Sequence, residues 1–414
     1  MEQENRENAL VVADEGRALV ESAPRAGYWA RVSRRCKFLA RFAAISLLLF
    51  VLMFAATCPG AFSYKNVLYF GKDLGNLSAL AAKSSDTVYY TYGKEGASVI
   101  SYRGGVGVVH CGGTEIYAPD GELLLFLAGE YQNPRAAVAR DYFITYDFGG
   151  KSYTVCNSYV ELYRGTTEHP IYHVSVADTG HYAIVTAPEA TAIGEKLSLS
   201  EVLVFTPSFQ LVNRFGRAGA TVAATVSDSG NYVAIADATA AGAVVDVFAL
   251  GTQRQNASLT FADFPYQLSF ISDTALALVC EKAAYTFQTD GDLYGKIDYN
   301  GDMVCGADMN SDGIALILRH DSVSNIYRFV VTDKKGSVKG EFSHVQVMKD
   351  ISLSGDRVWL LLADRVMCYS LDDGAFVYEQ EISSSAVGVR ALNSTTAHVF
   401  YPSMTIMVST KERR

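Results

Sequence analysis

The sequence is poor in the motifs on which many enzyme active sites depend. Its 7 Cys form no CxxC pair, its 7 His show neither HExxH nor HxH spacing, and no GxSxG motif is present. These absences disfavour a zinc site and a serine nucleophile on a strand-to-helix elbow. We therefore predict no catalytic, cofactor-binding or metal-binding residue, and no cofactor.

Proline and basic residues are also scarce, and glycine is far below the share of a collagen-like chain. Only 9 Pro and 34 Gly occur among 414 residues, beside 25 Tyr and 21 Phe, which excludes collagen-like and low-complexity chains and favours a large, strand-rich core. The 35 Lys and Arg residues are outnumbered by 44 Asp and Glu residues. The net charge of −9 therefore disfavours nucleic acid as a partner.

One long apolar run, from Phe42 to Thr57, stands near the N-terminus, and no charged residue occurs between Arg41 and Lys65. Its Leu, Ile, Phe and Val residues together favour membrane insertion by about 3 to 5 kcal/mol. We predict a transmembrane helix over residues 38–58 that contacts the lipid bilayer. At roughly 31 Å this helix is long enough to cross the hydrocarbon.

The flanks of this run predict its orientation. Basic residues gather on the N-terminal side, which favours a cytoplasmic N-terminus; they are Arg25, Arg31, Arg34, Arg35, Lys37 and Arg41. A cleaved secretory signal is the alternative, but its charged region is unusually long. We predict a plasma-membrane protein with a largely disordered cytoplasmic tail (1–37), the transmembrane helix (38–58), a linker (59–72) and an extracytoplasmic domain (73–410).

A phrase of two apolar strands joined by a short polar turn recurs through this last domain. The clearest copies are Val174–Ala187 and Ala224–Ala238. The turns fall near residues 104, 141, 180, 230, 274, 313, 356 and 396, a spacing of about 42 residues. A third apolar strand follows each copy, and a fourth usually precedes the next, as at Leu259–Asp263.

Four antiparallel strands per repeat are typical of a β-propeller blade. We therefore predict an all-β propeller of four-stranded antiparallel blades, preceded by the one transmembrane helix. Eight blades are preferred, with seven as the alternative. Residues 64–92 precede the first full copy and are expected to supply the strand that closes the ring.

Some local patterns suggest sites but have simpler interpretations. Asp308–Gly313 (DMNSDG) resembles the start of a calcium loop, yet Arg319 stands where the loop requires Glu, so we interpret the segment as a hairpin turn. The cysteines lie singly among apolar strand residues, which predicts small buried side chains, with a Cys280–Cys305 disulfide as the alternative. Trp359 is expected in the core.

A family resemblance lies in Gln132-Asn133-Pro134 and the segment Val138–Val155 that follows. Through these residues the chain is similar to an uncharacterised family of single-pass bacterial membrane proteins, known mainly from clostridial-type bacteria. More broadly, the recurring strand phrases resemble the PQQ-like, or quinoprotein-type, propellers. The resemblance implies a cytoplasmic stub, one helix and an external propeller, but no activity. Since Trp359 is the only tryptophan in the predicted propeller, a quinone stacked between two tryptophans is excluded, and no cofactor site is carried over.

A propeller on a stalk without a catalytic motif favours a binding or scaffold module, not an enzyme. Its expected partner is an envelope protein, peptide or glycan. One alternative is a sensor or accessory subunit of a membrane complex, in which the cytoplasmic tail reports on the external domain. Another is an extracytoplasmic hydrolase or lyase with its residues gathered at the central channel.

Overall fold

The structure is a computed structural model that describes residues 32–49, 53, 87–90, 97–157, 160–188, 199–252, 254–320, 325–372 and 374–410. Its contacts divide the chain into two compact units, Met1–Phe70 and Gly71–Arg414. In the first unit, residues 32–49 and residue 53 are helical. Among the described residues, no helix combines the length and the apolar character needed to cross a membrane. The transmembrane helix predicted at 38–58 is thus not supported by the structure and stays a prediction; its positions 50–52 and 54–58 lie outside the described residues.

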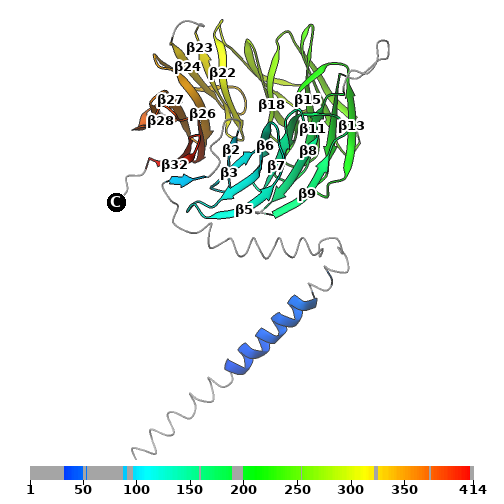
Figure 1. Cartoon of the computed structure of the whole chain (residues 1–414). Coiled ribbons are helices and arrows are strands. Elements are labelled where there is room, and N and C mark those ends of the chain that lie inside the picture. The colour runs from blue at the N-terminus through cyan, green and yellow to red at the C-terminus, as the bar shows by residue number, and fades with distance from the viewer. Residues whose placement is uncertain are drawn as a thin grey trace, which may run out of the picture. The chain divides into compact units, whose positions relative to one another are not determined.

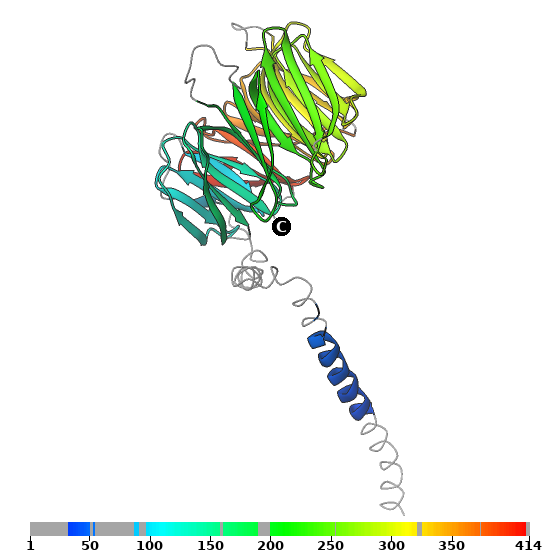
Figure 2. The same ribbon diagram turned by 90° about the vertical axis from the view of Figure 1, so that its right-hand side faces the viewer.

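The second unit is a ring of eight four-stranded sheets (Figure 1; the same ring is seen at right angles in Figure 2). All pairings between neighbouring strands of a sheet are antiparallel, as the register of the first blade illustrates. The predicted all-β propeller is therefore confirmed, with eight blades and not seven. Within this unit the described strands extend from Thr87 to Ser409.

The first strand of each blade contacts the first strand of the next, from β2 to β30, so these eight strands form the inner ring (Figure 1). They are β2 (Ser98–Tyr102), β6 (Pro134–Val138), β10 (Ile171–Val176), β14 (Ala220–Val226), β18 (Pro265–Ser272), β22 (Met303–Asn310), β26 (Met348–Ser354) and β30 (Gly388–Asn393). The second strands are β3 (Gly105–His110), β7 (Tyr142–Asp147), β11 (Tyr182–Thr186), β15 (Tyr232–Thr239), β19 (Ala275–Cys280), β23 (Gly313–Arg319), β27 (Arg357–Leu362) and β31 (Thr396–Phe400).

The third and fourth strands complete each blade toward the outside. The third strands are β4 (Gly113–Tyr117), β8 (Ser152–Asn157), β12 (Ser200–Phe205), β16 (Gly242–Ala249), β20 (Ala283–Gln288), β24 (Tyr327–Thr332), β28 (Arg365–Ser370) and β32 (Met404–Ser409). The outer strands are β5 (Leu123–Ala128), β9 (Val160–Thr166), β13 (Leu211–Arg217), β17 (Arg254–Phe261), β21 (Leu293–Asp298), β25 (Val338–His344), β29 (Phe376–Glu381) and β1 (Thr87–Tyr89).

The ring is closed by a strand from the beginning of the propeller. β1 pairs with β32, with Thr87 opposite Ile406, so the eighth blade combines β30, β31 and β32 with β1. The Tyr90 hydroxyl donates to the carbonyl oxygens of Tyr401, at 2.5 Å, and Met404, at 2.8 Å. The predicted closing strand within residues 64–92 is confirmed at Thr87–Tyr89; residues 64–86, 91 and 92 lie outside the described residues.

The burial of each strand follows its place in the blade. Second strands are covered on both faces by neighbouring blades, which explains continuous apolar runs such as Ala275–Cys280, all six residues of which are buried. Outer strands face solvent, and Phe376–Glu381 has no buried residue. Trp359 is fully buried on β27, which confirms its predicted place in the core.

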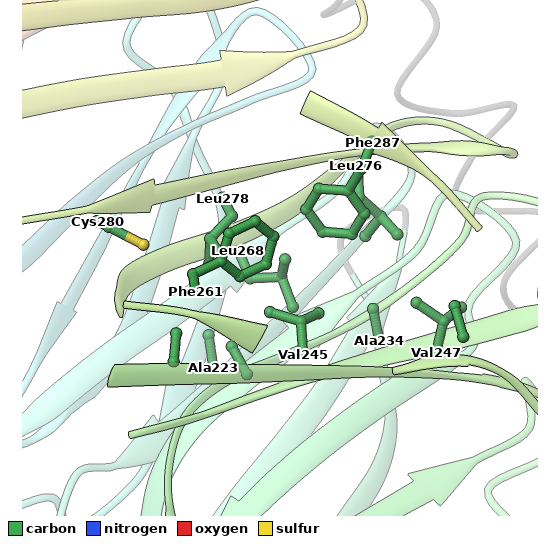
Figure 3. Close-up of a cluster of buried hydrophobic side chains, with 13 residues drawn as sticks. Ala223, Ala234, Val245, Val247, Phe261, Leu268, Leu276, Leu278, Cys280 and Phe287 are labelled. Atoms are coloured by element: carbon green, nitrogen blue, oxygen red, sulfur yellow. The ribbon is translucent and has the colours of Figure 1, made fainter. Parts of the chain in front are cut away.

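The core is divided among the interfaces between blades. In the interface between the fourth and fifth blades, small Ala side chains and Val245 and Val247 of β16 pack against Leu276 and Leu278 of β19 (Figure 3). The rings of Phe261 and Phe287 also belong to this cluster. Small residues on one sheet thus face larger ones on the next, which lets two twisted sheets pack closely.

One ionic cluster also joins two blades. Arg217, on the outer strand of the third blade, donates from Nε to Asp237 Oδ2 at 2.8 Å and from Nη2 to Asp246, both in the fourth blade. All three side chains are largely buried, with 14%, 6% and 10% exposed. Thr221 and Gln255 donate to the remaining carboxylate oxygens at 2.6 and 3.0 Å. The cluster therefore joins the third blade to the fourth through buried ion pairs.

Candidate functional site

The inner strands of the last three blades are tied together by polar contacts. Asp308 on β22 accepts the Leu353 N–H at 2.8 Å and the Ser352 hydroxyl at 3.1 Å, both on β26. The Ser352 hydroxyl oxygen in turn accepts the Ala391 N–H of β30 at 3.0 Å. A side chain of one inner strand thus satisfies a main-chain donor on the next strand.

This pattern changes where the ring closes, between β30 and β2. The last residue of each of these inner strands pairs across the hairpin, and positions can be compared by counting back from it. By this count Ala391 on β30 occupies the same position as Asp308 on β22 and Ser352 on β26. Its methyl group accepts no hydrogen bond. The two blades are joined instead by a side-chain pair, in which Ser101 Oγ lies 3.0 Å from His398 Nδ1.

A cavity of ≈ 600 Å³ lies at this junction. It is lined by the inner strands of four consecutive blades, together with the segments just before β2 and β30 and one residue of β31: Ala97, Ser98, Val99, Ile100, Ser101, Ala136, Val138, Asp350, Val387, Gly388, Arg390 and Phe400. Its size falls within the range of small-molecule and peptide sites. Two other cavities, of ≈ 520 and ≈ 500 Å³, lie away from the inner strands, apart from Met303 at the start of β22. The inner-ring cavity is therefore the candidate functional site.

Two charged side chains line the cavity. Arg390 donates from Nη1 to Asp308 Oδ1 at 2.9 Å, and 45% of its side chain is exposed against 13% for Asp308. Asp350 accepts the Val389 N–H at 2.8 Å. Burial raises the pKa of the Asp350 carboxyl, although hydrogen bonds and the nearby Arg390 oppose that effect. The exposed charge in the cavity is therefore the guanidinium.

The Ser101–His398 pair is not arranged as a nucleophile and base. Burial lowers the pKa of His398 to about 4, so its ring is neutral and weakly basic near pH 7. Among the described residues, no carboxylate contacts this ring to orient it, as a catalytic triad requires. The pair acts as a hydrogen-bonded link between the eighth and first blades.

The calcium-like segment Asp308–Gly313 forms the hairpin turn between β22 and β23, as predicted. Its polar side chains already have hydrogen-bond partners: Asp308 contacts β26 and Arg390, Asn310 accepts the Asp312 N–H within the turn at 2.8 Å, and Asp312 accepts the Gly355 N–H at 2.7 Å. No group of three or more His, Cys, Asp or Glu residues in the described part of the chain is placed to hold a metal ion.

The prediction of buried cysteines is only partly right. Cys156, Cys280 and Cys368 are buried, but Cys111 and Cys305 are exposed and do not fit it. Cys111 lies in the turn after β3, and Cys305 is the bulged residue between Val304 and Gly306 on an inner strand, where alternation of the two strand faces is interrupted. Cys280 and Cys305 are both free, so the alternative disulfide is wrong; Cys58 lies outside the described residues.

Sequence reasoning did not single out Ser101, Asp350, Arg390 or His398. Ser101 is 297 positions from His398 and meets it only because the ring closes, whereas Asp350, Arg390 and His398 lie in the consecutive seventh and eighth blades. A signal existed in the aligned repeats, where a polar residue on β22 and β26 is replaced by alanine on β30. Recognising it requires the register of each inner strand, which the apolar pattern alone does not supply.

A family model described as a family of unknown function (DUF5711) matches residues 82–406. No curated protein sequence matches the chain. Solved structures similar to it include the computationally designed Ika8 protein, at 13% identity and a TM-score of 0.60, with 78% of this chain and 98% of that one covered.

Two natural proteins show the same likeness. Sqt1 of Saccharomyces cerevisiae has 8% identity and a TM-score of 0.55, covering 79% of this chain and 99% of its own. BamB from Moraxella catarrhalis has 9% identity and a TM-score of 0.51, covering 80% and 99%. At these identities the likeness shows the β-propeller fold alone.

Proposed function

We propose, from the premise that the chain belongs to the DUF5711 family of unknown function, that it is a membrane-anchored extracytoplasmic propeller. It binds or scaffolds an envelope protein, peptide or glycan and performs no catalysis. The observation that carries the proposal is the inner-ring cavity of ≈ 600 Å³, which combines apolar walls with one exposed guanidinium. Such a mixture suits recognition, since apolar area supplies affinity and few polar groups supply orientation.

The closed ring favours the same function. The pairing of β1 with β32 closes the ring of eight blades through the first and last parts of the propeller, which makes the domain a rigid platform. The His398 ring lacks the basicity that a hydrolytic site needs, and no carboxylate among the described residues bonds to it. These features favour binding over the hydrolase or lyase alternative.

The anchoring part of the proposal is supported by the apolar run from Phe42 to Thr57 and the basic flank before it. Labelling of intact cells with a membrane-impermeant maleimide tests it, in a Cys58→Ser background. Cys111 and Cys305 are exposed in the propeller and are expected to react, whereas Cys36 is expected to react only after the membrane is permeabilised. Equal labelling of all three cysteines in intact cells would contradict this topology.

The binding part is tested by crosslinking the tagged full-length protein in its own cells, followed by mass spectrometry of what is captured with it. The expected result is a reproducible envelope protein, peptide or glycan crosslinked to the propeller. A matched control is the same chain with Gly242→Val, in which a side chain would collide with the Phe261 carbonyl and disrupt the fourth blade. Capture of the same molecules by this variant, or of none by the wild type, would refute the proposal.

A further inference from the structure

The inner strand β2 presents unpaired main-chain groups to the cavity. β2 and β3 are joined by the two-residue turn Arg103-Gly104, whose φ angles of 48° and 80° are those of a type I′ hairpin. In such a hairpin Tyr102 and Gly105 form a hydrogen-bonded pair. Counting back along the register, Val99 and Ser101 occupy the non-hydrogen-bonded positions, so their N–H and C=O groups point away from β3.

Nothing in the described part of the chain occupies this outward edge. No main-chain group of residues 97–101 bonds to a described residue other than those of β3. On β30, by contrast, the N–H groups of Val389 and Ala391 are taken by Asp350 and Ser352 of the preceding blade. The outward main-chain groups of β2 are thus available to an added strand, and both Val99 and Ser101 line the cavity.

Arg390 supplies the charge that such an added strand would meet. Its guanidinium has five N–H donors, and the bond to Asp308 uses one of them. Asp350, the other charged group in the lining, has one oxygen bonded to the Val389 N–H and the other to the Ile351 N–H. The cavity therefore offers N–H donors of Arg390 to a bound carboxylate. Its own carboxylate, Asp350, already accepts a hydrogen bond at each oxygen and is not available to a cation.

The remaining walls are apolar and open. Val138 and Val387 expose 38% and 59% of their surface, and Ala97, Ala136 and Phe400 line the same space. With a strand rise of about 3.3 Å per residue, an extended segment opposite the five residues of β2 would be about 17 Å long. Small apolar side chains suit these walls.

We propose that the cavity binds the C-terminal end of an extended apolar peptide. The peptide adds a strand to the free edge of β2, and its terminal carboxylate pairs with Arg390. We choose a chain terminus because the lining offers one exposed cation, Arg390, among apolar walls, and that guanidinium keeps N–H donors beyond the one bonded to Asp308. This inference rests on the proposed binding function and specifies its site and its partner.

The test measures fluorescence anisotropy of N-terminally labelled Ala-Val-Ala-Val-Ala with the purified full-length protein in detergent. We expect the free acid to bind at least tenfold more tightly than the C-terminal amide. The Arg390→Gln variant is expected to lower affinity for the acid to that of the amide and to leave the amide unchanged, whereas Arg390→Lys keeps part of the preference. A peptide N-methylated at alternate residues is expected to lose binding because it cannot pair with β2.

The matched control is Arg214→Gln, which removes one exposed cation from an outer strand, where Arg214 is 50% exposed and pairs with Glu201. It is expected to leave both affinities unchanged. Any of three results would overturn the proposal. The wild type binds the acid and the amide equally, or Arg390→Gln and Arg214→Gln lose the same affinity for the acid. The third is that the acid does not bind at 1 mM, a concentration well above that of ordinary peptide sites.

The cellular crosslinking distinguishes this failure from failure of the proposed function. If Arg390→Gln still captures the wild-type partner, the propeller binds through another surface and the cavity proposal fails alone. If the wild type captures nothing, the binding function itself fails. Circular dichroism of each variant confirms that the propeller has folded.

Discussion

Removing the charge of Arg217 from the ionic cluster between the third and fourth blades is expected to destabilise the propeller strongly. Arg217→Met keeps much of the side-chain volume but leaves Asp237 and Asp246 as two buried carboxylates without a counter-charge. Both are at most 10% exposed, so solvent compensates them poorly. Breaking a buried pair in this way costs about 3–5 kcal/mol, whereas an exposed pair contributes at most about 1 kcal/mol.

The assay is urea unfolding of the full-length protein at pH 7.5, followed by tryptophan fluorescence in a Trp29→Phe background. Trp359 is then the sole reporter, and it is fully buried in the seventh blade. The midpoint and the slope are compared between variants, because a large ring need not unfold in one step. Arg217→Lys retains the charge but loses the bidentate geometry, and is expected to fall between wild type and Arg217→Met.

The decisive variant removes all three charges. Arg217→Met combined with Asp237→Asn and Asp246→Asn leaves no buried charge, and is expected to recover most of the loss. A loss below about 1 kcal/mol in the single variant would refute the reasoning, because the cluster would then behave like a surface ion pair. A triple variant as unstable as the single one would also refute it, since packing and not charge would then be responsible.

Two further predictions concern the closing junction and the fourth blade. Burial holds the pKa of His398 at about 4 against 6.5 unfolded, so the neutral ring contributes stability above pH 6.5 that is lost as the pH falls toward 4, up to about 3 kcal/mol. His398→Gln should reduce the fall in unfolding free energy between pH 7 and pH 5, measured by urea titration at both values. An unchanged fall would show that His398 does not cause it. Gly242 has φ +123°, and an added Cβ would lie 2.1 Å from the Phe261 carbonyl oxygen, so Gly242→Ala should lower stability by about 1–3 kcal/mol. Gly251→Ala adds its methyl group to open space and should not lower stability. Equal urea midpoints for Gly242→Ala and Gly251→Ala would refute the steric argument.

The propeller itself could be predicted because its physics is local and repeated. Second strands such as Ala275–Cys280 are apolar throughout since both faces are covered, and the polar turns between strands recur at one spacing. The closing strand also followed from position alone, since a strand-forming segment before the first full repeat had no partner nearby. Eight repeats of this kind leave few other ways to bury the apolar faces.

The candidate site could not be predicted in the same way. Ser101 and His398 are separated by almost the whole propeller, and Arg390 and Asp350 come from different repeats. Each looks unremarkable in its own strand. Their meeting depends on register, on the bulge between Ala391 and Asn393, and on an alanine where the two preceding blades have a polar group. Periodicity determines which residues are apolar, but not which polar residues become neighbours when the ring closes.

The closure of the ring has a consequence for synthesis of the chain. Thr87 pairs with Ile406, so β1, the first strand in the described part of the chain, must wait for a partner 319 positions later (406 − 87). At about 5–20 residues per second, the ribosome needs roughly 16–64 s to supply it. Throughout that interval β1 has no partner strand for its main-chain groups, and the nascent domain is not yet a closed ring. A closing strand of only three residues keeps the exposed template for wrong pairing as small as the fold allows.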